Sequence, residues 1–304
     1  MTDRETPLEQ SEFDRFPDPA GNQSARIDIS GIVVELDGLP DDLAAAMQAR
    51  YAPYIGPATG TGAPLRLRLV GAPLDYFVPP GFAQRKEDYR VLTAFDGRIF
   101  RFTSYRLAAW FDLDRRAGQV ALAQGDLDPG PRAMENVLRS AVAWLAMDTG
   151  GFLLHGASIV RGGAAYLFFG PSGAGKSTLA ATSRSGEVIS DDLTLVLRRP
   201  EGLRASGGPF RGTYTAGAPV VGLFPVQGFY RLRKDPRTFV RPGDAACFAD
   251  LLGNLPWIVD QLPRHPHLID RVRNLVEGAS FSYLHFRKDE DFWPAVEGSR
   301  PLAP

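Results

Sequence analysis

The stretch that decides the fold reads Gly170-Pro171-Ser172-Gly173-Ala174-Gly175-Lys176-Ser177-Thr178. It contains a complete G-x-x-x-x-G-K-[ST] phosphate loop. Glycines in such a loop let backbone N–H groups turn inward around phosphate oxygens, and the helix that follows adds its positive N-terminus. Lys176 is expected to reach the β- and γ-phosphates of ATP, and the Ser177 hydroxyl is expected to bind Mg²⁺. We therefore predict that residues 170–178 bind ATP with Mg²⁺.

The residues before the loop predict a β-hairpin. Apolar runs over 152–160 and 165–169 are joined by Arg161-Gly162-Gly163, so the second strand leads directly into the loop. A strand before the loop and a helix after it are the context that this kind of phosphate binding requires. The context therefore favours a true phosphate loop over a Gly-rich turn of chance composition.

Two adjacent carboxylates follow the loop. Strands are expected over 187–190 and 193–197, with Asp191 and Asp192 between them. A crossover between parallel strands needs about a dozen residues, and residues 176–186 supply it, which brings both aspartates beside the loop at the carboxyl ends of the strands. One carboxylate can then bind Mg²⁺ while the other accepts a proton from an attacking hydroxyl. The sequence leaves open which aspartate has which role.

The order of Leu154-His155-Gly156, a hairpin, the phosphate loop and Ser190-Asp191-Asp192 resembles the catalytic domain of HPr kinase/phosphorylase. That family belongs to the phosphoenolpyruvate-carboxykinase-like (PEP-carboxykinase-like) branch of the phosphate-loop proteins. The resemblance covers residues 150–215, and 130–295 as architecture. It implies an α/β fold and a Mg²⁺-dependent serine kinase that uses ATP. The catalytic residues that it implies are His155, Asp191, Asp192 and Arg211, and the implied Mg²⁺ ligands are Ser177, Asp191 and Asp192.

The chain also departs from that family. Thr178 stands where the family usually carries an acidic residue, and residues 1–125 do not resemble its usual N-terminal domain. We therefore expect the phosphate acceptor to be a serine of another protein or peptide. The alternative is a non-catalytic or ATPase-type nucleotide-sensing module that binds a protein partner. The presence of both Asp191 and Asp192 favours chemistry, because ATP binding alone needs fewer carboxylates.

Other phosphate-loop proteins fit less well. A transporter ATPase would need a Leu-Ser-Gly-Gly-Gln type motif and a much later acidic strand, and Ala205-Ser206-Gly207-Gly208 lacks both the order and the flanks. Guanylate kinases begin at the loop and lack the preceding hairpin. The sequence therefore favours the resemblance to HPr kinase/phosphorylase over these two classes.

The rest of the chain is expected to form a separate N-terminal part. Residues 1–23 are polar and rich in proline, which predicts a flexible tail. Residues 24–125 predict a strand-rich α+β lobe suited to partner or substrate recognition, with a helix over 40–51. A break at 126–131 precedes a helix over 132–147, and residues 130–295 are expected to form the kinase-like domain. Turns are expected at Asp96-Gly97 and Ala117-Gly118.

The C-terminal part carries one charged and one aromatic pattern. A basic run over 231–234 together with Arg237 indicates a solvated face, with a docking surface for an acidic partner as the second interpretation. The alternating aromatic residues of 281–286 predict a core strand, and Trp293 is expected to anchor the packing.

Composition excludes several classes of protein. Of the 304 residues, 44% are hydrophobic and 23% charged, and the net charge is −1, so no global field recruits nucleic acid. The N-terminus lacks the apolar core of a signal peptide, and no stretch approaches a membrane span. The lone Cys247 reads as a small buried residue and fits a reducing compartment, so a cytoplasmic protein is expected. A homo-oligomer is compatible with these data.

Overall fold

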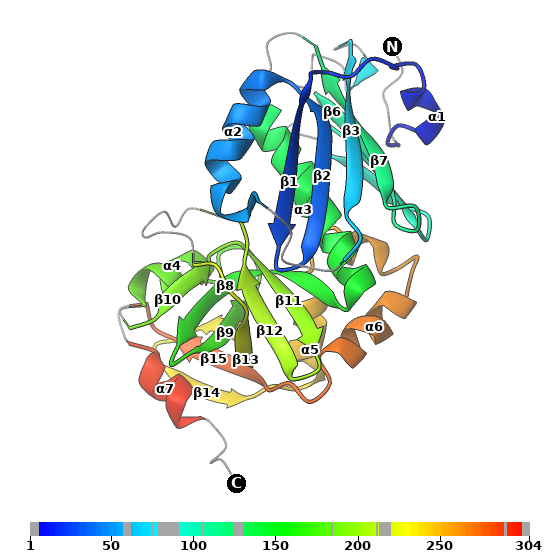
Figure 1. The fold of residues 1–304 in the computed structure, drawn as a ribbon. Coiled ribbons are helices and arrows are strands. Elements are labelled where there is room, and N and C mark those ends of the chain that lie inside the picture. Colours follow the sequence, from blue (N-terminus) through cyan, green and yellow to red (C-terminus); the bar gives the residue numbers. More distant parts are fainter. Residues whose placement is uncertain are drawn as a thin grey trace. The chain divides into compact units, whose positions relative to one another are not determined.

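The computed structural model describes residues 6–56, 62–73, 76–77, 91–104, 106–124, 130–183, 185–210, 212, 220–288 and 291–299. The chain divides into two compact units, Met1–Leu145 (unit 1) and Ala146–Pro304 (unit 2). Each unit is mixed α/β and is built on a sheet with both parallel and antiparallel strands (Figure 1). No helix among the described residues is long and apolar enough to cross a membrane. The mixed sheets and helices of both units confirm the expected α/β fold class.

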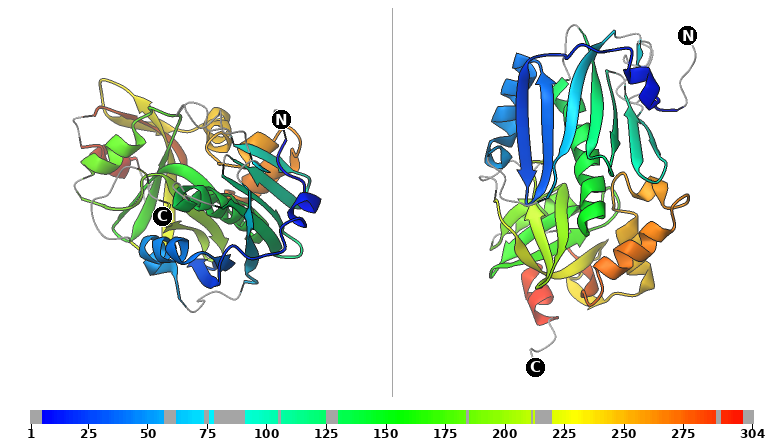
Figure 2. Two further views of the ribbon diagram at one scale, coloured as in Figure 1. Left: turned by 90° about the horizontal axis from the view of Figure 1, so that it is seen from above. Right: turned by 45° about the vertical axis from the view of Figure 1, so that its right-hand side comes forward.

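Unit 1 contains one sheet in the order β1-β2-β3-β7-β6-β5-β4, as far as its residues are described. Its strands are β1 (Gln23–Ile29), β2 (Ile32–Leu39), β3 (Leu65–Ala72), β4 (Leu92–Phe95), β5 (Ile99–Thr103), β6 (Leu107–Asp112) and β7 (Ala117–Ala123). Helix α2 (Asp41–Tyr51), continued by a 3-10 turn over Ala52–Tyr54, and helix α3 (Gly130–Thr149) lie on one face of the sheet (Figures 1 and 2). The pairs β2–β3 and β3–β7 are parallel and the others antiparallel. The strand-rich character and the helix over 40–51 are confirmed.

Part of the expected tail is ordered, which corrects the prediction for residues 6–23. Helix α1 (Gln10–Phe13) packs on the other face of the sheet, with Leu8 and Phe13 completely buried. The backbone N–H of Leu8 donates to Oγ1 of Thr103 at 2.9 Å. The two apolar side chains stand among many polar residues, which is why composition alone predicted a tail.

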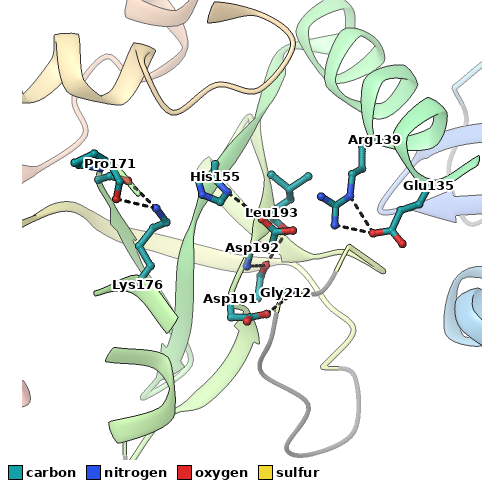
Figure 3. Close-up of polar contacts among 11 residues, drawn as sticks. Glu135, Arg139, His155, Pro171, Lys176, Asp191, Asp192, Leu193 and Gly212 are labelled. Carbon is teal, nitrogen blue, oxygen red and sulfur yellow. Dashed lines mark hydrogen bonds and ion pairs between the residues drawn. The ribbon is translucent and has the colours of Figure 1, made fainter. Parts of the chain in front are cut away.

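The boundary between the units falls inside α3 rather than at 126–131, of which 126–129 lie outside the described residues. The ring of Trp144 stacks on Phe95 with centroids 3.8 Å apart. Near the start of the helix, Glu135 forms an ion pair with Arg139, drawn in Figure 3, and with Arg50 of α2. Most of α3, up to Leu145, thus belongs to unit 1, and this corrects the assignment of the whole helix to the kinase-like domain.

The turn expected at Ala117-Gly118 is also displaced, because both residues belong to β7. The reversal lies over 114–116, where the Asp112 carboxylate accepts the backbone N–H groups of Asp114 and Arg115. A side-chain hydrogen bond of this kind makes a tight turn without glycine.

Unit 2 holds the phosphate loop. Its strands are β8 (Gly151–Arg161), β9 (Ala164–Phe169), β10 (Glu187–Ser190), β11 (Leu193–Arg199), β12 (Gly202–Gly207), β13 (Phe224–Lys234), β14 (Phe239–Pro242) and β15 (Phe281–Phe286). Its helices are α4 (Lys176–Thr182), α5 (Ala245–Leu252), α6 (His267–Leu275) and α7 (Trp293–Gly298), with a 3-10 turn over Val259–Gln261. The pairings run β8-β11-β12-β13-β9 and return to β8. The strands therefore close a circuit rather than form an open sheet.

The hairpin before the loop is confirmed. Strands β8 and β9 are antiparallel, and Gly162 and Gly163 adopt φ values of 58° and 75° in the turn, a conformation that glycine adopts without strain. Tyr166 and Phe168 on β9 are completely buried against Trp293, which is 1% exposed. The expected anchoring role of Trp293 is therefore confirmed.

Strands β9 and β10 run in the same direction, as the crossover predicts, but they are not neighbours. Both are antiparallel to β8, which lies between them. In the register, Gly156 of β8 is opposite Phe169 and Ser158 is opposite Ser190. The ends of β9 and β10, where the phosphate loop and the aspartates begin, thus flank the same short part of β8.

Candidate functional site

The phosphate loop leaves β9 at Gly170 and enters α4 at Lys176. Gly175 has φ +105°, and a Cβ built there would lie 2.6 Å from Cζ of Phe286 on β15. Both the backbone conformation and the close approach therefore require glycine at this position. The ring of Phe286 therefore packs directly against the loop at Gly175.

Lys176 is almost fully buried although it carries the main positive charge of the loop, with 8% of the residue exposed. Its Nζ donates to the carbonyl oxygens of Gly170 at 2.7 Å and Pro171 at 3.2 Å, as Figure 3 shows. Burial lowers the pKa of Lys176, the Asp192 charge opposes this shift and the Arg231 charge adds to it. The ammonium group is thus held by the loop's own backbone, close enough to Asp192 to feel its charge.

Asp192 lies in the β10–β11 connection and contacts His155 of the neighbouring strand β8. Nδ1 of His155 lies 2.9 Å from Oδ1 of Asp192 (Figure 3). The backbone aligns the pair, because Gly156 N–H donates to the Asp192 carbonyl at 2.8 Å. The Asp192 carboxylate side chain is 16% exposed and the His155 ring 41% exposed, so both can reach a ligand.

Asp191 lies deeper, with 4% of the residue exposed. Its Oδ1 accepts the backbone N–H of Gly212 at 2.8 Å (Figure 3). A Cβ at Gly212 would lie 2.7 Å from Oδ2 of Asp191, so glycine permits this approach. The two aspartates therefore differ: an amide holds Asp191, and an imidazole holds Asp192.

These residues line one cavity of about 750 Å³. The predicted site residues on its wall are His155, Ser172, Gly173, Gly175, Lys176, Ser177, Thr178, Asp191 and Asp192. Gly170, Pro171 and Ala174 belong to the loop but are not among the residues that line the cavity. Arg211 lies outside the described residues, although its neighbour Gly212 lines the cavity.

Sequence reasoning missed a second group of residues on the cavity wall. Lys234 ends β13 and Asp235 follows it, and Arg287 and Lys288 follow β15. The two strands are parallel, with Lys234 opposite Phe286 in the register, so their ends reach the cavity together. The basic run and the aromatic strand lie about 50 positions apart in the sequence, and only their parallel pairing would have revealed the group.

Arg231 corrects the interpretation of the basic run as a solvated face. The residue is 7% exposed, and its Nε donates to Oδ2 of Asp250 on α5 at 2.7 Å. A Cβ built at Gly170 would lie 3.1 Å from Nη1 of Arg231. Along β13, Arg231 and Leu232 are buried whereas Arg233 and Lys234, at the end of the strand, are exposed.

The donor set fits a magnesium ion. The Ser177 hydroxyl and the carboxylates of Asp191 and Asp192 line the same cavity, and all three supply the oxygen ligands that Mg²⁺ prefers. Mg²⁺ usually takes one or two carboxylates and completes its shell with water and phosphate. In the described part of the chain, no group of three or more His, Cys, Asp and Glu residues is arranged to hold a metal ion.

Cys247 takes no part in this site. It is completely buried, and burial raises the pKa of its thiol to about 11. The thiol is therefore neutral at pH 7, as expected for a small core residue.

The site thus combines a phosphate loop, hard oxygen donors and a carboxylate paired with an imidazole. Such a set can bind a polyphosphate, hold a divalent cation and accept a proton. No family model matches the chain, and no curated protein sequence matches it significantly. The function is therefore argued from the residues of the site.

Proposed function

We propose that the protein is a Mg²⁺-dependent kinase that transfers the γ-phosphoryl group of ATP to a hydroxyl, namely a serine of a protein or peptide. One observation carries the proposal: Lys176 of the phosphate loop and the carboxylates of Asp191 and Asp192 line the same cavity. The resemblance to HPr kinase/phosphorylase supports it, and the proposal includes a PEP-carboxykinase-like fold for unit 2.

Phosphate binding falls to the loop. Lys176 donates to the carbonyls of Gly170 and Pro171, and we propose that its ammonium group turns to the β- and γ-phosphates when ATP binds. Ser177 and Asp191 would hold Mg²⁺, which when bound neutralises charge on those phosphates. The amide of Gly212 fixes the position of the Asp191 carboxylate, which suits a metal ligand.

Proton transfer falls to Asp192. The acceptor hydroxyl attacks the γ-phosphorus, the bond to the β–γ bridging oxygen breaks, and ADP leaves. The hydroxyl proton passes to the Asp192 carboxylate, which His155 orients through the 2.9 Å contact. Asp192 therefore acts as the general base and His155 as the residue that positions it.

The reaction can be tested with ATP labelled in the γ-phosphate. The purified protein is incubated with labelled ATP, Mg²⁺ and a cell lysate or the product of a neighbouring gene. Label on a serine of one peptide or protein supports the kinase, and its loss in Asp192→Asn ties it to this site. Label only in free phosphate, or ATP binding without turnover, would replace the proposal with the nucleotide-sensing module.

A further inference from the structure

A buried arginine lies near Gly170, the first residue of the phosphate loop. Arg231 of β13 is opposite Phe169, the last residue of β9, in the parallel register. Its side chain is 9% exposed and donates through Nη1 to the Leu232 carbonyl, and a Cβ built at Gly170 would lie 3.1 Å from Nη1. A buried cation of this kind is stable only while its partner remains charged and in place.

That partner is Asp250 on α5. Oδ2 of Asp250 lies 2.7 Å from Nε of Arg231 and 3.9 Å from Nη2 of Arg233. The backbone carbonyl of Asp250 accepts a hydrogen bond from Nδ2 of Asn254 at 2.7 Å. The carboxylate and the carbonyl of one residue thus connect Arg231 to the segment that follows the helix.

Asn254 completes the connection to the other side of the site. Its carbonyl accepts the backbone N–H of His155 at 2.8 Å, and the His155 ring contacts Asp192. The contacts therefore run without a break from Arg231 beside Gly170, through Asp250 and Asn254, to His155 and Asp192. All of these residues belong to unit 2.

We propose that residues 250–254 act as a brace that holds the phosphate loop and the His155–Asp192 pair in register, with Asp250 as its positioning residue. The inference rests on the proposed function, because it assigns the two ends of the brace to nucleotide binding and proton transfer. Transfer of a phosphoryl group depends chiefly on such positioning. Neither Asp250 nor Asn254 lines the cavity, so the brace acts through other residues.

The test compares Asp250→Asn with Asp244→Asn on the same helix. Asp244 caps α5 by accepting Cys247 N–H and takes no part in the brace. In Asp250→Asn we expect ATP affinity and kcat each to fall about tenfold, the effect of weakening one charged hydrogen bond. We expect hydrogen exchange at the His155 amide to accelerate by a similar factor. Asp244→Asn should lower the melting temperature and leave ATP affinity, kcat and His155 exchange unchanged.

Several outcomes would decide the matter. Unchanged His155 exchange and unchanged ATP affinity in folded Asp250→Asn would overturn the brace, and so would equal effects in Asp244→Asn. If Asp250→Asn does not fold, Asn254→Ala removes only the Nδ2 contact, and faster His155 exchange in that variant supports the proposal while unchanged exchange overturns it. If the wild-type protein binds no ATP, the proposed function fails, whereas the exchange comparison still decides whether the brace exists.

Discussion

Buried charges are treated differently in the two units. In unit 1 the Glu135 side chain, 9% exposed, lies between the guanidinium groups of Arg50 and Arg139. In unit 2 the ammonium of Lys176 and the carboxylate of Asp191 are held by backbone carbonyls and a backbone amide. The Lys176 and Asp191 side chains also line a cavity, whereas the Glu135 contacts are side-chain ion pairs.

The difference separates a structural charge from a functional one. An ion enclosed by opposite side chains has its desolvation offset within the fold, and removing one partner destabilises the protein. An ion held by backbone groups on a cavity wall keeps its charge available to a ligand. Substitution of Lys176 or of an aspartate on the cavity wall should therefore affect binding or activity, and substitution of Glu135 should affect stability.

The largest effect is expected for Asp192→Asn, which removes the proposed base. Phosphoryl transfer should fall between about 10²- and 10⁴-fold, the range for a positioned general base, while ATP binding changes little. Single-turnover transfer and calorimetric ATP titration measure the two effects. Asp270→Asn on α6, an exposed carboxylate paired with Arg273, is the control and should leave both unchanged. Full transfer activity in Asp192→Asn would remove the base assignment.

Lys176→Ala tests the next largest effect. A hydrogen bond to a charged group contributes about 1.5–3 kcal/mol, so ATP affinity should fall by roughly one to two orders of magnitude. The folded state should not lose stability by a comparable amount, because the variant also removes a buried ammonium. Calorimetry gives the affinity and urea unfolding gives the stability. Unchanged affinity would show that the loop does not bind the nucleotide.

Glu135→Gln probes the other side of the comparison. The substitution leaves Arg50 and Arg139 without their shared carboxylate, and we expect the free energy of unfolding to fall by about 1–3 kcal/mol. This loss of unfolding free energy is smaller than for a fully buried ion pair, because the Arg50 side chain is 43% exposed. Urea unfolding measures the change. A loss of ATP affinity with no loss of stability would contradict the structural role assigned to the Glu135 ion pairs.

That the phosphate loop and the two aspartates line one cavity was predictable, because these residues are close in sequence. The phosphate loop, the hairpin before it and Asp191-Asp192 span a short segment whose spacing limits how it can fold. The position of β8 between β9 and β10 was not predictable, because a crossover length fixes direction and not adjacency. His155 and Asp192 meet because β10 and β11 pair with consecutive parts of the same side of β8, while β9 pairs with its other side.

Features that depend on long-range packing escaped the sequence. Arg231 was interpreted as solvated because its neighbours are basic, yet it is buried beside Gly170 and paired with Asp250 of α5. Leu8 and Phe13 are isolated apolar residues, and no periodic pattern marks them before the sheet exists to receive them. In each case the sequence shows the residue type, while a partner far along the chain decides its burial.

The smallest effect concerns an exposed charge, Asp244, and its sign follows from its contacts. The hydroxyl of Tyr283 donates to Oδ1 of Asp244 at 2.6 Å and Cys247 N–H donates at 3.1 Å, and these two bonds lower the pKa of Asp244 in the folded protein. A carboxyl whose pKa is lower in the folded than in the unfolded chain stabilises the fold above its unfolded pKa of about 3.9. That contribution disappears as the pH falls through the lower, folded pKa, because both states are then protonated.

The Asp244→Asn variant tests this prediction. Asn also caps helices well, so the substitution removes mainly the part of the stability that is linked to charge. We expect the difference in melting temperature between the wild type and Asp244→Asn to be largest near pH 7 and to shrink below about pH 4. Thermal unfolding monitored by circular dichroism over this range tests it. A difference that does not depend on pH would mean that the charge of Asp244 does not set the stability of this helix end.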